Sequence, residues 1–345
     1  MIPKNFMNVR EGDFIETIDN LIFDVKGLIH PSDRVIAYVR YVEDPNGDRE
    51  RNGRRYKKIY SLNERDSYLK KNYPHYLYFD PYFNRIIESV PLENISKHYK
   101  PIERLKEMYQ KFPVLDKIEK EALEMVLLII DEANISLNNI GISGSILVNL
   151  YNNFSDIDLV IYGKENCFKV YEALNRIIEK NDFIKRYSNE DLKKLHEFRA
   201  KDTNISFEDF LKIERRKVLQ GKFKTRDYFI RFIKEFNEIN EKYGDKTFTP
   251  IGYTCLKAKI IDDSDSIFTP CCYIVDEVEY MDNSNYKPLK QIISFRGRFC
   301  EQAKNGEKII AQGKIEKVSS KNEEYYQLVI GENIKDFMIL EKYMI

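Results

Sequence analysis

One stretch constrains the fold more than any other, residues 141–163, which read G-I-S-G-S-I-L-V-N-L-Y-N-N-F-S-D-I-D-L-V-I-Y-G. Side chains alternate between the two faces of a strand, so Asp156 and Asp158 share one face and the apolar residues around them occupy the other. Two carboxylates held side by side repel each other unless a cation lies between them, and oxygen ligands suit Mg²⁺ or Mn²⁺. The stretch therefore predicts a metal site on a strand.

A second feature of the same stretch is the pair Gly144-Ser145, which opens the apolar segment Ile146–Leu150. This segment is predicted to begin a helix, and the amides at a helix N-terminus favour a phosphate group. A metal site beside a phosphate site is the resulting expectation.

Length and charge set outer limits on the protein. At 345 residues, with 56 basic and 56 acidic side chains, the chain predicts two or three domains and no overall field that would attract nucleic acid. The longest apolar run, Met125–Ile130, is far short of the ~20 residues that a membrane span needs. Without a signal sequence at its start, the chain is expected to be a soluble cytoplasmic protein with no membrane partner.

The five cysteines fit a reducing compartment. Four of them gather in the last hundred residues without the spacing of a zinc knuckle, which favours buried thiols over a metal site. These four are Cys255, Cys271, Cys272 and Cys300.

Residues 1–110 predict a β-rich N-terminal domain with short helices. Strands at Arg34–Val42 and Tyr56–Ser61 flank a turn, and the connection between them is strongly basic. It reads either as a solvated, disordered loop or as a contact for phosphate or RNA, and the first interpretation is favoured. The aromatic segment 73–83 could stack on bases, but burial is favoured. The basic residues are Arg49, Arg51, Arg54, Arg55, Lys57 and Lys58.

Residues 111–240 alternate helix and strand and predict a compact mixed α/β core. One helix is expected to run from the Gly-Ser pair to about Asn152. Three more helices are expected over Cys167–Lys180, 189–202 and 206–220. The last ends in a basic patch around Arg216 that either complements the helix dipole or binds a substrate phosphate. Residues 245–345 predict five short strands in a small barrel or sandwich. The fold class is therefore α+β.

The central stretch resembles the signature of the DNA polymerase β-like nucleotidyltransferase superfamily, in which Gly-Ser precedes Asp-x-Asp on a strand; here ten residues separate Ser145 from Asp156. Over its whole length the chain is similar to an archaeal group of predicted nucleotidyltransferases with extra domains on both sides of the core. The resemblance implies transfer of a nucleoside monophosphate from an NTP such as ATP to a hydroxyl acceptor, with RNA as one candidate acceptor, and release of pyrophosphate.

The resemblance also implies roles for single residues. Asp156 and Asp158 would hold two Mg²⁺ (or Mn²⁺) ions, while Ser145 and the amides of Gly144 to Ile146 would bind the nucleotide phosphates. The superfamily has a third metal-binding carboxylate on a neighbouring strand. Asp227 is the candidate, because it heads an apolar strand about 70 residues past Asp158. An alternative is that Asp227 only ends the basic turn, and Asp262, Asp263 and Asp265 are weaker candidates in a turn.

Two departures from the superfamily pattern stand out. Ile146 and Leu147 follow Gly-Ser where many members have an arginine, and Ser143 precedes it where an apolar residue is usual. A catalytically inactive nucleotide- or RNA-binding protein that uses the same core as a platform is therefore the alternative function. A purely structural protein with an incidental Asp-x-Asp is a third, remote one.

Overall fold

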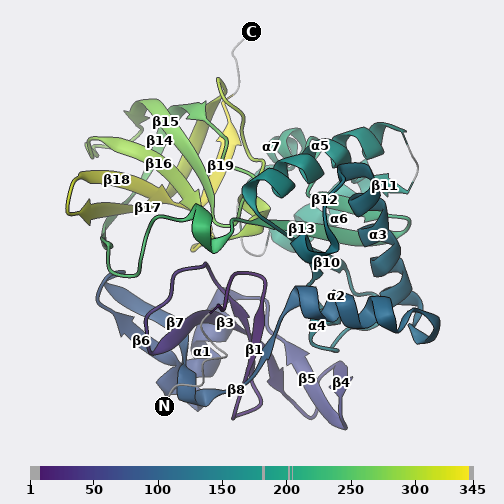
Figure 1. Ribbon diagram of the computed structural model, residues 1–345. Coiled ribbons are helices and arrows are strands. Elements are labelled where there is room, and N and C mark those ends of the chain that lie inside the picture. The colour runs from purple at the N-terminus through teal and green to yellow at the C-terminus, as the bar shows by residue number, and fades with distance from the viewer. Residues whose placement is uncertain (1–7, 181–182, 201–202, 204, 342–345) are drawn as a thin grey trace. The chain divides into compact units, whose positions relative to one another are not determined.

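The computed structural model describes residues 8–180, 183–200, 203 and 205–341, which form a mixed α+β protein (Figure 1). They group into two compact units. The first holds the described residues of Met1–Tyr78, Ile86–Lys185 and Val218–Asn240, and the second those of Phe79–Arg85, Arg186–Lys217 and Glu241–Ile345.

This grouping cuts the chain differently from the predicted division into 1–110, 111–240 and 245–345. The N-terminal strands and the elements after residue 111 share one unit because they share a core, in which Phe14, Tyr41 and Tyr56 pack with Leu147 and Leu150. Such a cluster excludes water from both sets of elements and couples them energetically.

Eight strands form the N-terminal sheet, most of which belongs to the first unit, in the order β4-β5-β3-β2-β1-β8, with β7 pairing with β3 and β6 with β7. Asn20, with φ +61°, makes the turn between β1 and β2. In the aromatic segment, Tyr76 is fully buried against Phe23, whereas Phe79 is largely exposed. The strands are β1 (Phe14–Thr17), β2 (Ile22–Val25), β3 (Arg34–Glu43), β4 (Arg49–Arg51), β5 (Arg54–Lys58), β6 (Leu77–Asp80), β7 (Arg85–Pro91) and β8 (Ile95–Tyr99), and helix α1 (Leu62–Asn72) follows β5.

The second sheet of this unit has the order β11-β12-β13-β10-β9. Its central strands β10 and β13 run parallel, with Ile157 opposite Tyr228, and every other pairing is antiparallel. Helix α5 packs on β10 and β13, and α3 packs on α5. The elements are α2 (Pro101–Gln110), α3 (Lys117–Ala133), β9 (Ile140–Ile142), α4 (Gly144–Leu147), β10 (Ile157–Tyr162), α5 (Lys164–Lys180), β11 (Ile184–Lys185), β12 (Gln220–Phe223) and β13 (Arg226–Ile233).

The helix expected from Gly144 to about Asn152 is a single turn, α4, so that prediction was wrong. The chain leaves the helical conformation at Val148, and Asn149 has a positive φ of +54°, which an α-helix does not tolerate. The apolar residues after the Gly-Ser pair enter the core as an irregular segment.

The second unit contains a closed five-stranded barrel, so of the two predicted alternatives, a small barrel or a sandwich, the structure has the barrel. The strands follow the order β14-β15-β16-β18-β17, and pairing of β14 with β17 closes the ring while β19 adds to β17. The strands are β14 (Lys246–Asp262), β15 (Cys271–Tyr280), β16 (Leu289–Ser294), β17 (Lys308–Ser320), β18 (Glu324–Val329) and β19 (Phe337–Leu340).

Two helices belong to this unit, α6 (Asn189–Arg199) and α7 (Phe207–Glu214). Helix α7 ends earlier than predicted. Residues 201–202, at the end of the range predicted for α6, lie outside the described residues.

The basic patch after α7 makes structural contacts within the second unit. Arg216 forms a two-pronged ion pair with Glu307, at 2.5 and 2.8 Å. Lys217 is buried and donates to the side chain of Gln302 (2.9 Å). These cations therefore fix α7 to the barrel.

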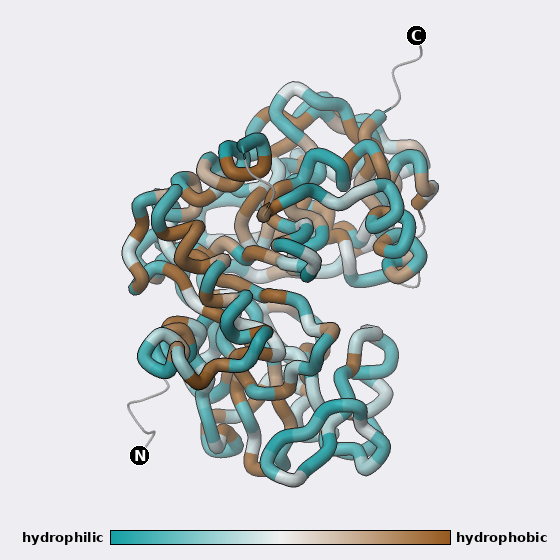
Figure 2. The backbone as a smooth tube through the Cα atoms, turned by 90° about the vertical axis from the view of Figure 1, so that its right-hand side faces the viewer, coloured by the Kyte–Doolittle hydropathy of each residue, from teal (hydrophilic) through white to brown (hydrophobic). Residues whose placement is uncertain are grey.

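Figure 2 shows the hydropathy of both units, with many of the connecting loops coloured as hydrophilic. All five cysteines are free thiols. In the described part of the chain, no helix combines the length and the apolar character that crossing a membrane requires.

Candidate functional site

The Gly-Ser turn packs closely against strand β10. The Ser143 N–H donates to the Asp158 carbonyl oxygen (2.8 Å), which holds the turn against the strand. Gly144 has φ +60°, and a Cβ atom at this position would lie only 1.9 Å from Oδ2 of Asp158. Only glycine fits there, because the Asp158 carboxylate lies directly over the backbone of the turn.

Ser143, which departs from the superfamily pattern, has a clear contact of its own. Its hydroxyl donates to the Gly12 carbonyl oxygen (2.6 Å). The serine therefore fastens the Gly-Ser turn to the N-terminal segment just before β1, a contact that an apolar residue could not make.

Asp158 is partly buried, and its environment disfavours the charged form. Its pKa is raised to about 7, mainly by burial and in addition by repulsion from Asp156. Lys58, Arg231 and Arg40 oppose the shift, so the carboxylate is surrounded by cations that do not fully compensate for its loss of water. The two aspartates are thus near each other, as the Asp-x-Asp pattern predicted.

A cavity of about 40 Å³ lies in front of Asp158, with room for a water molecule or a small ion. Both sheets of the first unit contribute to its wall, so the site does not belong to the predicted core alone. The lining residues are Phe14, Asp24, Arg40, Tyr41, Lys58, Ser143, Gly144, Asp158, Leu159, Val160, Phe229 and Arg231.

One cation of the cavity, Arg231, has carboxylate partners. Its Nη1 atom lies 2.7 Å from Glu11 Oε1 and 3.4 Å from Asp24 Oδ1. Lys26 pairs with the same two acids, at 3.1 and 2.7 Å. Burial alone would raise the pKa of Asp24, but Lys26 and Arg231 lower it to about 2, so the Asp24 carboxylate is ionised and paired with these two cations.

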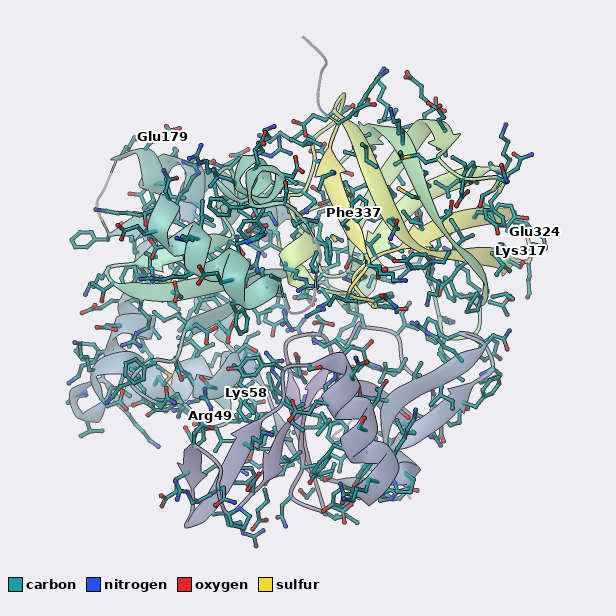
Figure 3. All side chains as sticks on the ribbon, turned by 180° about the vertical axis from the view of Figure 1, so that it is seen from behind. Arg49, Lys58, Glu179, Lys317, Glu324 and Phe337 are labelled. Atoms are coloured by element: carbon teal, nitrogen blue, oxygen red, sulfur yellow. The ribbon has the colours of Figure 1, made fainter. Side chains whose placement is uncertain are left out.

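Two other cations of the cavity, Arg40 and Lys58, make no ion pair with any residue that the structure describes. Burial opposes the charge on Lys58, yet the nearby Tyr41 hydroxyl and the Asp156 carboxylate raise its pKa above the ordinary value. Figure 3 labels Lys58 together with Arg49 from the same hairpin. Sequence reasoning noticed Lys58 only as part of a basic run and missed Arg40, because nothing in a strand's local sequence shows what faces it.

The basic hairpin β4–β5 is ordered, and the interpretation as a disordered loop was wrong. Arg49 donates to the Leu150 carbonyl oxygen (2.6 Å) and to Ser155 Oγ (3.3 Å). From the other side, Arg226 donates to the Ser155 carbonyl oxygen (2.8 Å). Two arginines therefore fix the loop that leads into Asp156.

The predicted phosphate-binding residues have different surroundings. Ser145 is 2% exposed, and its hydroxyl has no hydrogen-bond partner among the described residues. The side chain of Ile146 is fully buried in the core, so only its backbone could contact a ligand. Because α4 is one turn long, little helix dipole supports this position.

Asp227 lies at the start of β13, one position before Tyr228, which is opposite Ile157 of β10. Alternation puts it on the same face of the strand as Phe229 and Arg231, which line the cavity. Its carboxylate pairs with Lys222 (2.8 Å) and is half exposed, and it is not part of the cavity wall. Within the described residues, no three His, Cys, Asp or Glu side chains are grouped so that they could hold a metal ion.

The chain is similar to a protein of the archaeon Methanocaldococcus jannaschii described as "Uncharacterized protein MJ1086". The two sequences are 32% identical over 334 residues, which are 94% of this chain and 96% of the archaeal protein. The chain belongs to the family of that protein. Since the match covers almost the whole length, it extends over both units. No family model matches the chain, and no solved structure matches it significantly.

Proposed function

We propose that the protein is a metal-dependent nucleotidyltransferase that moves a nucleoside monophosphate from an NTP to a hydroxyl acceptor, with RNA as a candidate acceptor. The observation that carries the proposal is the contact between Gly144 and Asp158. The carboxylate of the second aspartate of Asp-x-Asp lies against the glycine of the Gly-Ser pair, so the two halves of the predicted motif are in contact.

The donor set supports a hard divalent cation at this position. Asp156 and Asp158 offer carboxylate oxygens only, and the pKa of Asp158 is raised by burial first and by repulsion from Asp156 second. These two residues would hold Mg²⁺ or Mn²⁺. When bound, such ions polarise the phosphoryl oxygens and lower the pKa of the attacking hydroxyl.

The chain's own residues would position the reactants. The acceptor oxygen forms a bond to the α-phosphorus, the bond from that phosphorus to the bridging oxygen breaks, and pyrophosphate leaves. The acceptor's proton goes to a carboxylate, for which Asp227 is the proposed base once it leaves Lys222. Ser145 and the backbone of the Gly-Ser turn would contact the phosphates, which gives the buried Ser145 hydroxyl an acceptor.

A second candidate function is nucleotide or RNA binding without turnover. It is favoured by the ion pair of Asp227 with Lys222, which leaves only two aspartates at the proposed metal site among the described residues. The core would then serve as a binding platform.

The test is incubation of the full chain with Mg²⁺ or Mn²⁺, each α-labelled NTP and total RNA. Label transferred by the parent, with equal release of pyrophosphate, and lost in D156N and D158N, supports the enzyme. Transfer lost also in D227N would assign the third carboxylate. Nucleotide binding without any label transfer or pyrophosphate would leave the binding platform as the function.

A further inference from the structure

Arg40 and Lys58 lie side by side in the N-terminal sheet and face the two aspartates of the core. Lys58 is opposite Tyr41 in the pairing of β5 with β3, which makes it the neighbour of Arg40 across the sheet. Both line the cavity in front of Asp158. Both also lie over the ring of Tyr60, with Arg40 Cζ 5.4 Å and Lys58 Nζ 4.9 Å from its centroid.

The orientation of Arg40 depends on an irregularity of β3. In a regular strand Arg40 and Tyr41 would point to opposite faces, yet both line the cavity. The pairing of β3 with β2 shifts at this point, because Tyr41 is opposite Ile22 while Val39 is opposite the next residue, Phe23. Arg40 is thus the extra residue of a β-bulge, a feature that redirects side chains and is frequent beside functional sites.

The charges around the cavity are balanced in a way that leaves these two cations available. Four carboxylates and four cations lie in or beside the cavity, but Glu11, which precedes β1, and Asp24 of β2 already pair with Lys26 and Arg231. Divalent metal ions on the Asp156–Asp158 pair would remove the remaining negative charge near Arg40 and Lys58. The positive charges of Arg40 and Lys58 would then be left without a counter-charge, and the phosphates of a polyphosphate ligand would neutralise them. The carboxylates are Glu11, Asp24, Asp156 and Asp158.

We infer that Arg40 and Lys58 bind the phosphates of a nucleoside triphosphate at the Asp156–Asp158 site. The inference rests on the proposed function and gives the N-terminal sheet a role in it. It also accounts for the absence of an arginine after the Gly-Ser pair, where Ile146 and Leu147 enter the core. The cations that the motif lacks are supplied by a sheet more than 80 residues earlier in the chain.

The test is equilibrium binding of ATP, ADP and AMP to the full chain in Mg²⁺, for the parent and for R40Q and K58Q. A matched control is K57Q, since Lys57 is the exposed neighbour of Lys58 on β5 and pairs with Glu64 (2.7 Å). Each lost charge-assisted contact is expected to weaken ATP binding about tenfold or more, with AMP binding unchanged. K57Q should bind all three nucleotides like the parent, and R40K and K58R should recover part of the loss.

The outcomes separate this inference from the function on which it rests. If the parent binds no nucleotide, both fail. If the parent binds ATP and transfers label but R40Q and K58Q keep the parental preference for ATP over AMP, only the phosphate-binding role fails. Equal weakening of ATP and AMP would mean that the cations merely support the fold, and that also overturns it. Thermal unfolding of each variant identifies any that is misfolded. If one of R40Q and K58Q is misfolded, the nucleotide binding of the other tests the phosphate-binding role.

Discussion

Replacing Gly144 with alanine tests the central contact of the site. An alanine in the left-handed region costs about 1–2 kcal/mol. At Gly144 the new Cβ would also lie 1.9 Å from Oδ2 and 2.7 Å from Cγ of Asp158, so the carboxylate or the turn must move. Overpacking of this kind adds about 1–3 kcal/mol. G144A is therefore expected to lower the free energy of unfolding by about 2–5 kcal/mol and to reduce the proposed nucleotide transfer, because Asp158 is displaced.

A second glycine provides the control for backbone strain alone. Gly53, at the tip of the β4–β5 hairpin, has φ +75°, and a Cβ atom there would have no neighbour within 4 Å. G53A should therefore lose only about 1–2 kcal/mol. The assay is equilibrium urea unfolding, with hydrogen exchange of the β10 amides to follow the first unit.

A double-mutant cycle isolates the clash itself. Adding D158A to G144A removes the two nearest atoms, Oδ2 and Cγ, and leaves only the Cβ atom of residue 158, at 2.9 Å, so the two changes should couple by most of the overpacking cost, about 1–3 kcal/mol. If G144A loses no more stability than G53A, or if the cycle shows no coupling, the reasoning that Asp158 dictates the glycine is refuted.

Three further predictions concern charge. The pKa of Asp158 in the folded state (about 7) lies above its ordinary value of 3.8, so the folded state holds an extra proton at pH values between the two. The free energy of unfolding should therefore fall by at most about 4 kcal/mol as pH rises from 4 to 7. Urea titrations measure this slope, and D158N should abolish it. His30 behaves in the opposite sense: burial lowers its pKa to about 4, and its Nδ1 accepts from the Ile36 N–H (3.2 Å). Its contribution to stability, at most about 3 kcal/mol, should be lost as pH falls from 6.5 to 4, and NMR should find the imidazole still neutral at pH 5. Finally, R49A should speed hydrogen exchange in the loop before Asp156 and lower the free energy of unfolding by about 1–3 kcal/mol. The control R54A, at an exposed pair with Glu43, should lower it by under about 1 kcal/mol. Equal losses in the two variants would contradict the anchoring role of Arg49.

The sequence alone predicted those features that depend on interactions between residues close together in the chain. Alternation placed Asp156 and Asp158 on one face of β10, and turn residues located the hairpins. In the C-terminal region, alternating apolar residues and turns predicted five strands, all of which form the barrel. The short α4 was missed because apolar periodicity does not reveal a left-handed Asn149.

Contacts between distant segments could not be predicted in this way. The basic hairpin reads as solvated because closely spaced cations normally seek water, yet Arg49 finds its partners at Leu150 and Ser155, about a hundred residues away. The bulge that turns Arg40 into the cavity is a property of strand pairing, and pairing depends on which strands the fold brings together.

By itself, the sequence determined the Gly-Ser turn, the paired aspartates and the five C-terminal strands, because each depends on the conformations of residues close together in the chain. The closure of those strands into a barrel depends on the pairing of β14 with β17, which lie far apart in the sequence. Only the tertiary structure decided what surrounds the aspartates. It brought Arg40 and Lys58 to them, committed Arg231 to Glu11 and Asp24, and left Asp227 paired with Lys222. Charge interactions reach several ångströms across the folded molecule regardless of chain separation, so the electrostatics of this site exist only once both sheets of the first unit have packed.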